Sequence, residues 1–153
     1  MTKNIDFKYA TLSDEQAHFI ATFLRFEFAL KEAGFCQPNG AAEVDWPKVA
    51  NELDEEFLET IRAEKVADTL INHPPKKQIV QNNILEWKDI EPVENTQGLL
   101  ESVRRTRNNL LHGGKSYEPN NERDRTLIAE AQAVTERVLL KLDPVLVFFE
   151  GRY

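Results

Sequence analysis

Apolar residues recur every three or four positions along most of this chain, which is the spacing of one face of an α-helix. The first such segment begins at Ser13-Asp14-Glu15-Gln16, a capping box, and ends at Gly34, because glycine readily adopts the positive φ that closes a helix. One face of this segment carries Phe19, Phe23, Phe26 and Leu30. The spacing therefore predicts a long helix that buries this face in a core.

The same helix has a second apolar stripe, formed by Ile20, Leu24 and Phe28, roughly 100–180° around the axis from the first. A surface helix of a lone domain buries an arc only somewhat wider than about 100°. The wider arc predicts burial on two sides, in a bundle and against another subunit. A central helix wrapped within one chain is the alternative.

The middle of the chain is less regular. A second helical region begins at Trp46-Pro47, since proline is well suited to a first helical turn, and ends at His73-Pro74-Pro75. The apolar residues of segment 76–95 lack a clear period and fit either a short helix or an extended cover over the core. This segment is therefore left without an assigned element.

Two more helices are predicted in the last third of the chain. Thr96 is the predicted cap of a helix that ends at Gly113-Gly114, and Asn121 begins a last helix that Pro144 divides. Almost no strand pattern is present. The chain is therefore predicted to be all-α, an antiparallel helical bundle of four to five helices that forms a single domain over residues 1–153.

The composition narrows the classes of function. A net charge of −7 and a pI near 5.1 argue against a protein that coats nucleic acid indiscriminately, because such binding depends on Lys and Arg. The single cysteine, Cys36, excludes an internal disulfide, and the three histidines are too scattered for a zinc site, so no metal or cofactor is predicted. No apolar run approaches the roughly 20 residues of a membrane span, and the first residues lead into no signal-peptide core. We therefore expect a cytoplasmic protein with no membrane partner.

The strongest candidates for a functional site are Arg107-Asn108 and His112, a cation, an amide and an imidazole that stand directly before Gly113-Gly114. In a helix, Asn108 lies one turn before His112, and Arg104 extends the same stripe. Arg107 is about 140° away from His112 and projects from the apolar side, a costly place for a guanidinium unless an acid, an anion or a partner chain meets it. The alternative is that Arg107 reaches water past the leucines and His112 only caps the helix.

A small cationic patch surrounds these residues in an otherwise acidic chain. The stretch from Glu101 to Lys115 contains Arg104, Arg105 and Arg107 as well as Lys115, with Glu101 as its only acid. Such a patch favours phosphate binding, although a solvated helix face gives the same pattern.

Two charged residues of the first helix, Glu27 and Lys31, fall inside its apolar arc one turn apart. Either they pair with each other, or Glu27 contacts Arg107 or His112. Both are accessory candidates for a site near the motif.

The stretch Arg107-Asn108-x-x-x-His112 resembles the motif of the HEPN superfamily, in which Arg is followed by four to six residues and then His, commonly with a polar residue after the Arg. Residues 25–34 (RFEFALKEAG) resemble the first long helix of the small HEPN proteins. In small toxins paired with nucleotidyltransferase antitoxins, a Tyr often stands two residues after the His. This chain has Gly114 there, and Tyr117 is the nearest tyrosine, a further accessory candidate.

The resemblance implies an all-helical, usually dimeric domain. Many members are metal-independent endoribonucleases, often toxins of toxin–antitoxin or anti-phage systems, whereas others only bind RNA, nucleotides or protein partners. An antitoxin is therefore an expected partner if the chain is a toxin. A catalytically inactive RNA-binding, nucleotide-binding or protein-interaction module is the alternative.

The expected reaction is attack of the ribose 2′-hydroxyl on the adjacent phosphate, which leaves a 2′,3′-cyclic phosphate and a 5′-hydroxyl. We assign His112 to proton transfer, Arg107 to stabilising the phosphorane charge, and Asn108 to orienting the imidazole or binding a phosphate oxygen. Arg104, Arg105 and Lys115 are the candidate RNA-binding residues. Because one chain offers one histidine in the site, a homodimer that brings together two motif helices is expected to supply both acid and base.

Overall fold

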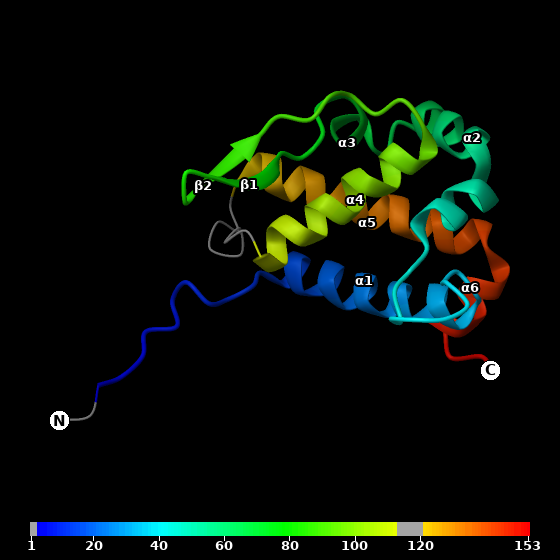
Figure 1. Cartoon of the computed structure of the whole chain (residues 1–153), viewed down its shortest axis with the longest axis horizontal. Coiled ribbons are helices and arrows are strands. Elements are labelled where there is room, and N and C mark those ends of the chain that lie inside the picture. Colours follow the sequence, from blue (N-terminus) through cyan, green and yellow to red (C-terminus); the bar gives the residue numbers. More distant parts are fainter. Residues whose placement is uncertain (1–2, 113–120) are drawn as a thin grey trace.

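A computed structural model describes residues 3–112 and 121–153 and shows a predominantly helical protein (Figure 1). These residues form six helices and one two-stranded antiparallel sheet. In chain order the elements are α1 (Asp14–Glu32), α2 (Trp46–Glu64), α3 (Asp68–Asn72), β1 (Lys77–Gln81), β2 (Ile84–Lys88), α4 (Thr96–His112), α5 (Glu122–Lys141) and α6 (Asp143–Phe149). None of the described helices is long and apolar enough to cross a bilayer.

The boundaries of α1 confirm the sequence prediction. The Ser13 hydroxyl oxygen accepts a hydrogen bond from the Gln16 amide at 3.1 Å, and the Gln16 side chain accepts one from the Ser13 amide at 2.8 Å, so the capping box is complete. Gly34, with φ of 93°, follows the end of the helix. The predicted core stripe of Phe19, Phe23, Phe26 and Leu30 is buried.

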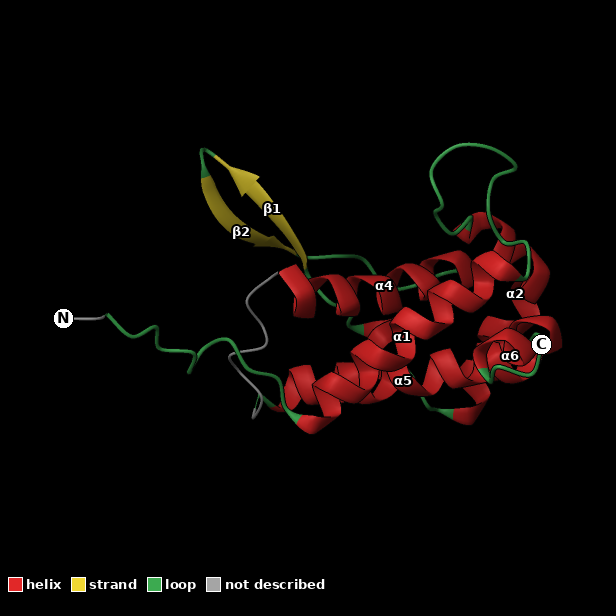
Figure 2. Ribbon diagram, turned by 90° about the horizontal axis from the view of Figure 1, so that it is seen from below, coloured by secondary structure: helices red, strands yellow, loops and turns green. Residues whose placement is uncertain are grey.

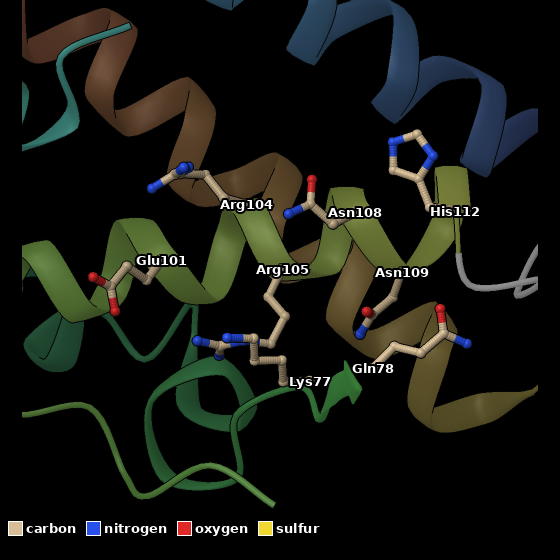
Figure 3. A pocket seen from close by; sticks show the side chains of 8 residues that line it. All are labelled: Lys77, Gln78, Glu101, Arg104, Arg105, Asn108, Asn109 and His112. Atoms are coloured by element: carbon tan, nitrogen blue, oxygen red, sulfur yellow. The ribbon is translucent and has the colours of Figure 1, made fainter. Parts of the chain in front are cut away.

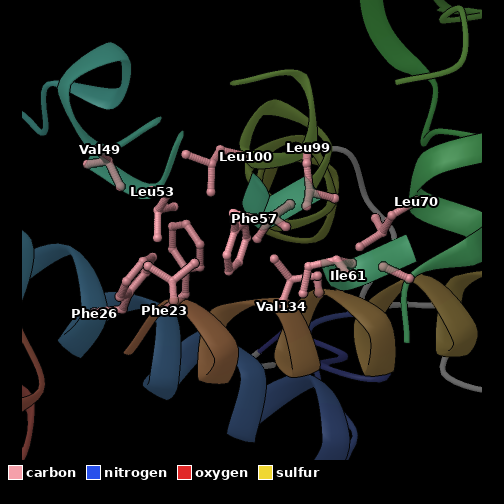
Figure 4. Packing of buried hydrophobic residues seen from close by; sticks show 14 of the residues in the cluster. Phe23, Phe26, Val49, Leu53, Phe57, Ile61, Leu70, Leu99, Leu100 and Val134 are labelled. Carbon is pink, nitrogen blue, oxygen red and sulfur yellow. The ribbon is translucent and has the colours of Figure 1, made fainter. Parts of the chain in front are cut away.

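The core lies where α1, α2, α4 and α5 pack together. α1 packs against α5 and α6, while α4 packs against both α2 and α5. Figure 4 shows Phe23 and Phe26 of α1 facing Val49 and Leu53 of α2 across this core. All six helices contribute to one hydrophobic cluster, so α4 is held along its length by buried neighbours on its apolar side.

The second apolar stripe of α1 has a different environment. Ile20 and Phe28 are partly buried, and Leu24 is 57% exposed. A helix wrapped completely within one chain would bury Leu24, so that alternative does not describe α1. The exposed side chain of Leu24 therefore leaves apolar surface on the outside of the helical bundle.

The helical region that begins at Trp46 is interrupted twice. α2 ends at Glu64, its C-cap residue Lys65 has φ of 56°, and α3 begins only at Asp68, so the single region predicted from the sequence is two helices. Within α2, Asp54 has φ of 62° and ψ of −176° and bends the helix. A left-handed residue and a kink interrupt the hydrogen-bond ladder without interrupting the apolar pattern, which is why the pattern alone did not locate them.

The kink in α2 meets the first turn of α4. The Thr96 hydroxyl donates a hydrogen bond of 2.6 Å to the Asp54 carbonyl oxygen, and the Thr96 amide donates one of 3.3 Å to the Glu55 carboxylate. The Asn95 side chain accepts a hydrogen bond from the Gly98 amide at 2.7 Å. Asn95, and not Thr96 as predicted, therefore caps α4.

Backbone strain at Asp54 gives a stability prediction. Its φ and ψ lie in a region that is essentially restricted to glycine and costs other residues of order 1–3 kcal/mol. Its carboxylate also accepts a hydrogen bond from the Glu56 amide at 2.8 Å, as a helix cap does. Asp54→Gly also loses this cap, which costs only a few tenths of a kcal/mol with glycine, but it removes the larger strain, so we expect it to be at least as stable as the wild type. Asp54→Ala keeps the strain and loses the cap, and should be about 1 kcal/mol less stable. Urea unfolding of both variants tests this, and a glycine variant less stable than the alanine variant would contradict it.

The prediction of an all-α fold is wrong for segment 76–95, where β1 and β2 form a hairpin. Asn82 and Asn83 connect the strands with φ of 51° and 63°, the two positive values that a type I′ turn requires. Figure 2 shows the hairpin projecting from the helices. It is attached to α4 by Asn109, whose side-chain amide donates a 2.8 Å hydrogen bond to the Lys76 carbonyl oxygen.

The number of helices also differs from the four to five predicted. The additional elements are the short helices α3 and α6, which are separated from their neighbours at Lys65 and Leu142. The division of the last helix at Pro144 is confirmed, because Pro144 lies in the first turn of α6.

Candidate functional site

The exposed side of α4 is the floor of an open groove. Leu99, Leu100, Val103 and Leu110 hold the helix against the core, so the residues on the opposite side of the helix face outward. We call the concavity over this side the α4 groove. It is lined by Lys77, Gln78, Glu101, Arg104, Arg105, Asn108, Asn109 and His112 (Figure 3).

Three predicted site residues lie on one stripe of this groove. Arg104, Asn108 and His112 follow one another at intervals of four residues, and in Figure 3 their side chains emerge from the same side of α4. Asn108 and His112 are exposed. The stripe therefore presents a guanidinium, an amide and an imidazole to one ligand, as the helical spacing predicted.

Arg105 and Asn109 emerge from the other side of the groove floor. Arg105 donates a 3.4 Å hydrogen bond to the Pro75 carbonyl oxygen, so that both residues connect α4 to the chain that enters the hairpin. Lys77, on β1, points toward Arg105 in Figure 3. The hairpin thus adds a wall and a further cation to the groove.

The groove carries an excess of positive charge. Lys77, Arg104 and Arg105 stand against the single carboxylate of Glu101, and within residues 3–112 and 121–153 neither arginine forms an ion pair. Burial, and then the charge of Arg107, lower the pKa of Arg104 from its ordinary value. Burial likewise lowers the pKa of Arg105, against the opposing effect of Glu101. A bound anion would relieve this destabilisation of both cations.

Arg107 lies outside the lining of the groove. Its Nη1 is 3.1 Å from Oε1 of Glu27 on α1, and the two side chains are only 18% and 23% exposed. Its guanidinium also lies 5.0 Å from the centroid of the Phe23 ring. An acid, Glu27, therefore meets Arg107 on the apolar side of α4, and the predicted contact between these two residues is confirmed. The alternative, in which Arg107 reaches water past the leucines, is wrong.

The predicted alternative pairing of Glu27 with Lys31 is not observed. Lys31 Nζ lies 3.5 Å from the carbonyl oxygen of Ala42, a residue of the connection between α1 and α2. Lys31 does not line the α4 groove. Among the accessory candidates that the structure describes, Glu27 is next to the motif and Lys31 is not.

Lys115 and Tyr117 lie outside the described residues, as do the glycines that follow His112.

The hairpin and α4 both supply groove residues that sequence reasoning did not select. Lys77 and Gln78 enter through a tertiary contact, so no local spacing connects them with His112. The turn residues Asn82 and Asn83 were the available signal for a hairpin. Glu101 and Asn109 were visible on the same helix, and their helical positions place them at the edges of the groove floor.

The arrangement suits a phosphate-containing ligand more than a metal ion. Guanidinium and ammonium groups bind phosphate oxygens, and an exposed imidazole next to them can transfer a proton. In the part of the chain that the structure describes, no three His, Cys, Asp or Glu side chains form a cluster able to hold a metal.

Comparisons of the chain with protein-family models, curated proteins and solved structures gave no match.

Proposed function

We propose that this chain is a HEPN-like helical protein that cleaves RNA without a metal ion. The observation that carries the proposal is the stripe of Arg104, Asn108 and His112 in a cationic groove, with Arg107 fixed directly behind it by Glu27. Asn108 and His112 of this stripe, together with Arg107, are the residues by which α4 resembles the HEPN motif.

The proposed reaction uses the 2′-oxygen of the RNA as its nucleophile. The 2′-hydroxyl loses its proton, its oxygen forms a bond to the adjacent phosphorus, and the bond from phosphorus to the 5′-oxygen breaks as that oxygen gains a proton. His112 is the group that moves a proton. Arg104 and Asn108 hold the phosphate oxygens, on which negative charge accumulates in the phosphorane.

Arg107 has a positioning and electrostatic part in this proposal. Glu27 contacts Nη1, and a guanidinium has five N–H donors, so the pair leaves donors for a phosphate oxygen. The ion pair also fixes the side chain before the substrate binds. Such preorganisation lowers the cost of stabilising charge in the transition state.

The same ion pair favours a second candidate function. A guanidinium held by Glu27 and absent from the groove lining fits a module that binds RNA or nucleotides without cleaving them. Cleavage of a labelled single-stranded RNA in excess chelator distinguishes the two functions. Cleavage supports the nuclease, and saturable binding without cleavage supports the binding module.

A homodimer is part of the proposal, because the described residues of one chain contribute a single imidazole to the α4 groove, and the reaction needs both an acid and a base. Leu24 lies one turn before Glu27, and the exposed Leu111 lies one turn after Arg107. α1 and α4 run in opposite directions (Figure 1), so both leucines lie on the His112 side of the ion pair. They offer apolar surface for a second copy beside the groove. If the chain acts as a toxin, an antitoxin is a further partner that this surface could receive.

Sedimentation at micromolar concentration tests the dimer. We expect the wild type to be dimeric, and Leu24→Glu to be monomeric and to lose most of its cleavage activity, because a charge at an apolar contact must be desolvated. Leu140→Glu, at a leucine of α5 that is also exposed, is the matched control and should change neither property. A wild-type monomer with full activity would contradict the two-chain site.

A further inference from the structure

A second cavity lies between α4 and the connection from α1 to α2, and we call it the loop pocket. Its volume of about 460 Å³ is within the range of pockets that bind small ligands. Its polar lining consists of Gln37, Asn39, Glu43 and Asp45 from the connection, and of Gln97 and Arg104 from α4. None of these residues except Arg104 lines the α4 groove.

Arg104 joins the loop pocket to the α4 groove, because its side chain lines both. Figure 3 shows this side chain extending along α4 away from Asn108 and His112. Its guanidinium lies 4.9 Å from the centroid of the Trp46 ring, which is itself buried and stacked on Phe23. This support holds the guanidinium where the two cavities meet, so a strand bound to Arg104 reaches both of them.

The charge of the lining changes sign between the two cavities. Cations dominate the α4 groove, whereas in the loop pocket the carboxylates of Glu43 and Asp45 stand against Arg104 alone. Carboxylates repel a phosphate and attract N–H donors. The loop pocket therefore suits the base of a nucleotide whose phosphate is held in the neighbouring groove.

Glu43 is the carboxylate available for such a base. Asp45 is already engaged, because its two oxygens accept hydrogen bonds from the Gln37 side-chain amide at 2.9 Å and from the Lys48 backbone amide at 3.3 Å. Glu43 is exposed, and within residues 3–112 and 121–153 it forms no ion pair. Its carboxylate thus offers two acceptor oxygens to a ligand.

Guanine is the nucleobase whose hydrogen-bonding groups match this lining. Its Watson–Crick edge presents two adjacent donors, N1–H and the N2 amino group, to which the two oxygens of one carboxylate are complementary. Adenine instead places the acceptor N1 on this edge, where a carboxylate would repel it. The side-chain amides of Asn39 and Gln97 are donors for the O6 acceptor of guanine. The Watson–Crick edge is accessible only when the base is unpaired.

We propose that the loop pocket binds an unpaired guanine of the strand whose phosphates occupy the α4 groove, with Glu43 accepting from N1–H and the N2 amino group. This inference rests on the proposed function and names the base that the substrate carries. Arg104 and His112 are eight residues apart, which is about 12 Å along the helix axis. The bound guanine therefore belongs to a nucleotide away from the phosphate on which His112 acts, at a fixed distance from it.

Fluorescence anisotropy with two labelled DNA decamers tests the inference. Both are thymidine throughout except for one central position, which is deoxyguanosine in one decamer and deoxyadenosine in the other. Neither has a 2′-hydroxyl, so neither is cleaved by the proposed reaction, and excess chelator prevents a cation held by carboxylates from contributing. We expect the wild type to bind the deoxyguanosine decamer about 5- to 150-fold more tightly, the discrimination typical of a bidentate contact to a base.

Two variants locate the preference at Glu43. Glu43→Gln replaces one acceptor by a donor, so it should lose most of the preference for deoxyguanosine. Glu32→Gln removes the same charge from an exposed residue outside the loop pocket, and this matched control should keep the preference. The readout is a ratio of two affinities, so an effect of net charge on both decamers cancels.

Mapping of the cut positions gives a second readout. On a single-stranded RNA with one central guanosine, the wild type should cut at a constant position relative to that guanosine. Glu43→Gln should cut at positions spread along the strand, because Glu43 does not contact the reacting phosphate in this proposal. Wild-type cuts that do not depend on the position of the guanosine would overturn the inference.

The remaining outcomes separate this inference from its premise. Equal wild-type affinity for the two decamers, or an unchanged preference in Glu43→Gln, would overturn the inference while leaving the proposed nuclease intact. If the wild type binds neither decamer, the inference is overturned as well. Absence of RNA cleavage in addition would overturn the proposed nuclease together with it.

Discussion

Replacement of His112 by alanine is expected to slow RNA cleavage by about 10²–10⁴-fold, because a positioned acid or base contributes a factor of that size. Binding of RNA should remain nearly intact, since it depends on the cations of the α4 groove, Arg104 and Arg105. His18→Ala removes an exposed imidazole outside the groove and should cleave at the wild-type rate. Rates from single-turnover cleavage and affinities from anisotropy provide the two readouts.

Arg107→Ala should differ from His112→Ala by weakening both binding and cleavage. It removes a cation close to Arg104, and it leaves the half-buried carboxylate of Glu27 without its partner. Its folding must therefore be verified by circular dichroism before its activity is interpreted.

If His112→Ala cleaves at the wild-type rate, the assignment of proton transfer to His112 is wrong.

Replacement of Phe23 by alanine is expected to lower the free energy of unfolding by about 3–5 kcal/mol, the usual cost of removing a buried phenyl ring. Phe23 is fully buried and stacks on Trp46, with ring centroids 6.0 Å apart and planes inclined by 21°. Its ring also lies under the guanidinium of Arg107. The loss should therefore affect the core and the position of Arg107 together.

Urea unfolding measures this effect, with Leu140→Ala as the control on an exposed position of α5. The control should change stability by less than about 0.5 kcal/mol. A loss below about 1 kcal/mol for Phe23→Ala would mean that the ring is not at the centre of the core, and that the packing of α1 against α2 and α4 differs from the one described.

The sequence predicted the elements whose signals are local. Ser13 and Gln16 form the capping box of α1, Pro144 lies in the first turn of α6, and the polar stripe of α4 follows from spacing alone. Each of these features depends on residues within one or two helical turns, so the chain itself contains the whole signal. The contact between Glu27 and Arg107 was one of two predicted alternatives, and only the packing of α1 on α4 could select it.

The hairpin was missed because its strands lack the usual alternation. Ile79 and Val80 are adjacent and so are Ile84 and Leu85, which places apolar residues on both faces. A period of two is the main sequence signal for a half-buried strand, and it is absent here. Lys77 and Gln78 entered the α4 groove through this unpredicted element, and a tertiary contact of that kind leaves no trace in local spacing.

The central claim is that His112 and its neighbours cleave RNA through the substrate's own 2′-oxygen. The most direct test is to incubate the wild type, in excess chelator, with a labelled single-stranded RNA and with its fully 2′-O-methylated counterpart, and to identify the ends of the products by mass spectrometry. We expect the RNA to yield 2′,3′-cyclic phosphate and 5′-hydroxyl ends, and the methylated strand to remain whole, because its 2′-oxygen cannot attack. Products with 5′-phosphate ends, or cleavage of the methylated strand, would contradict the mechanism.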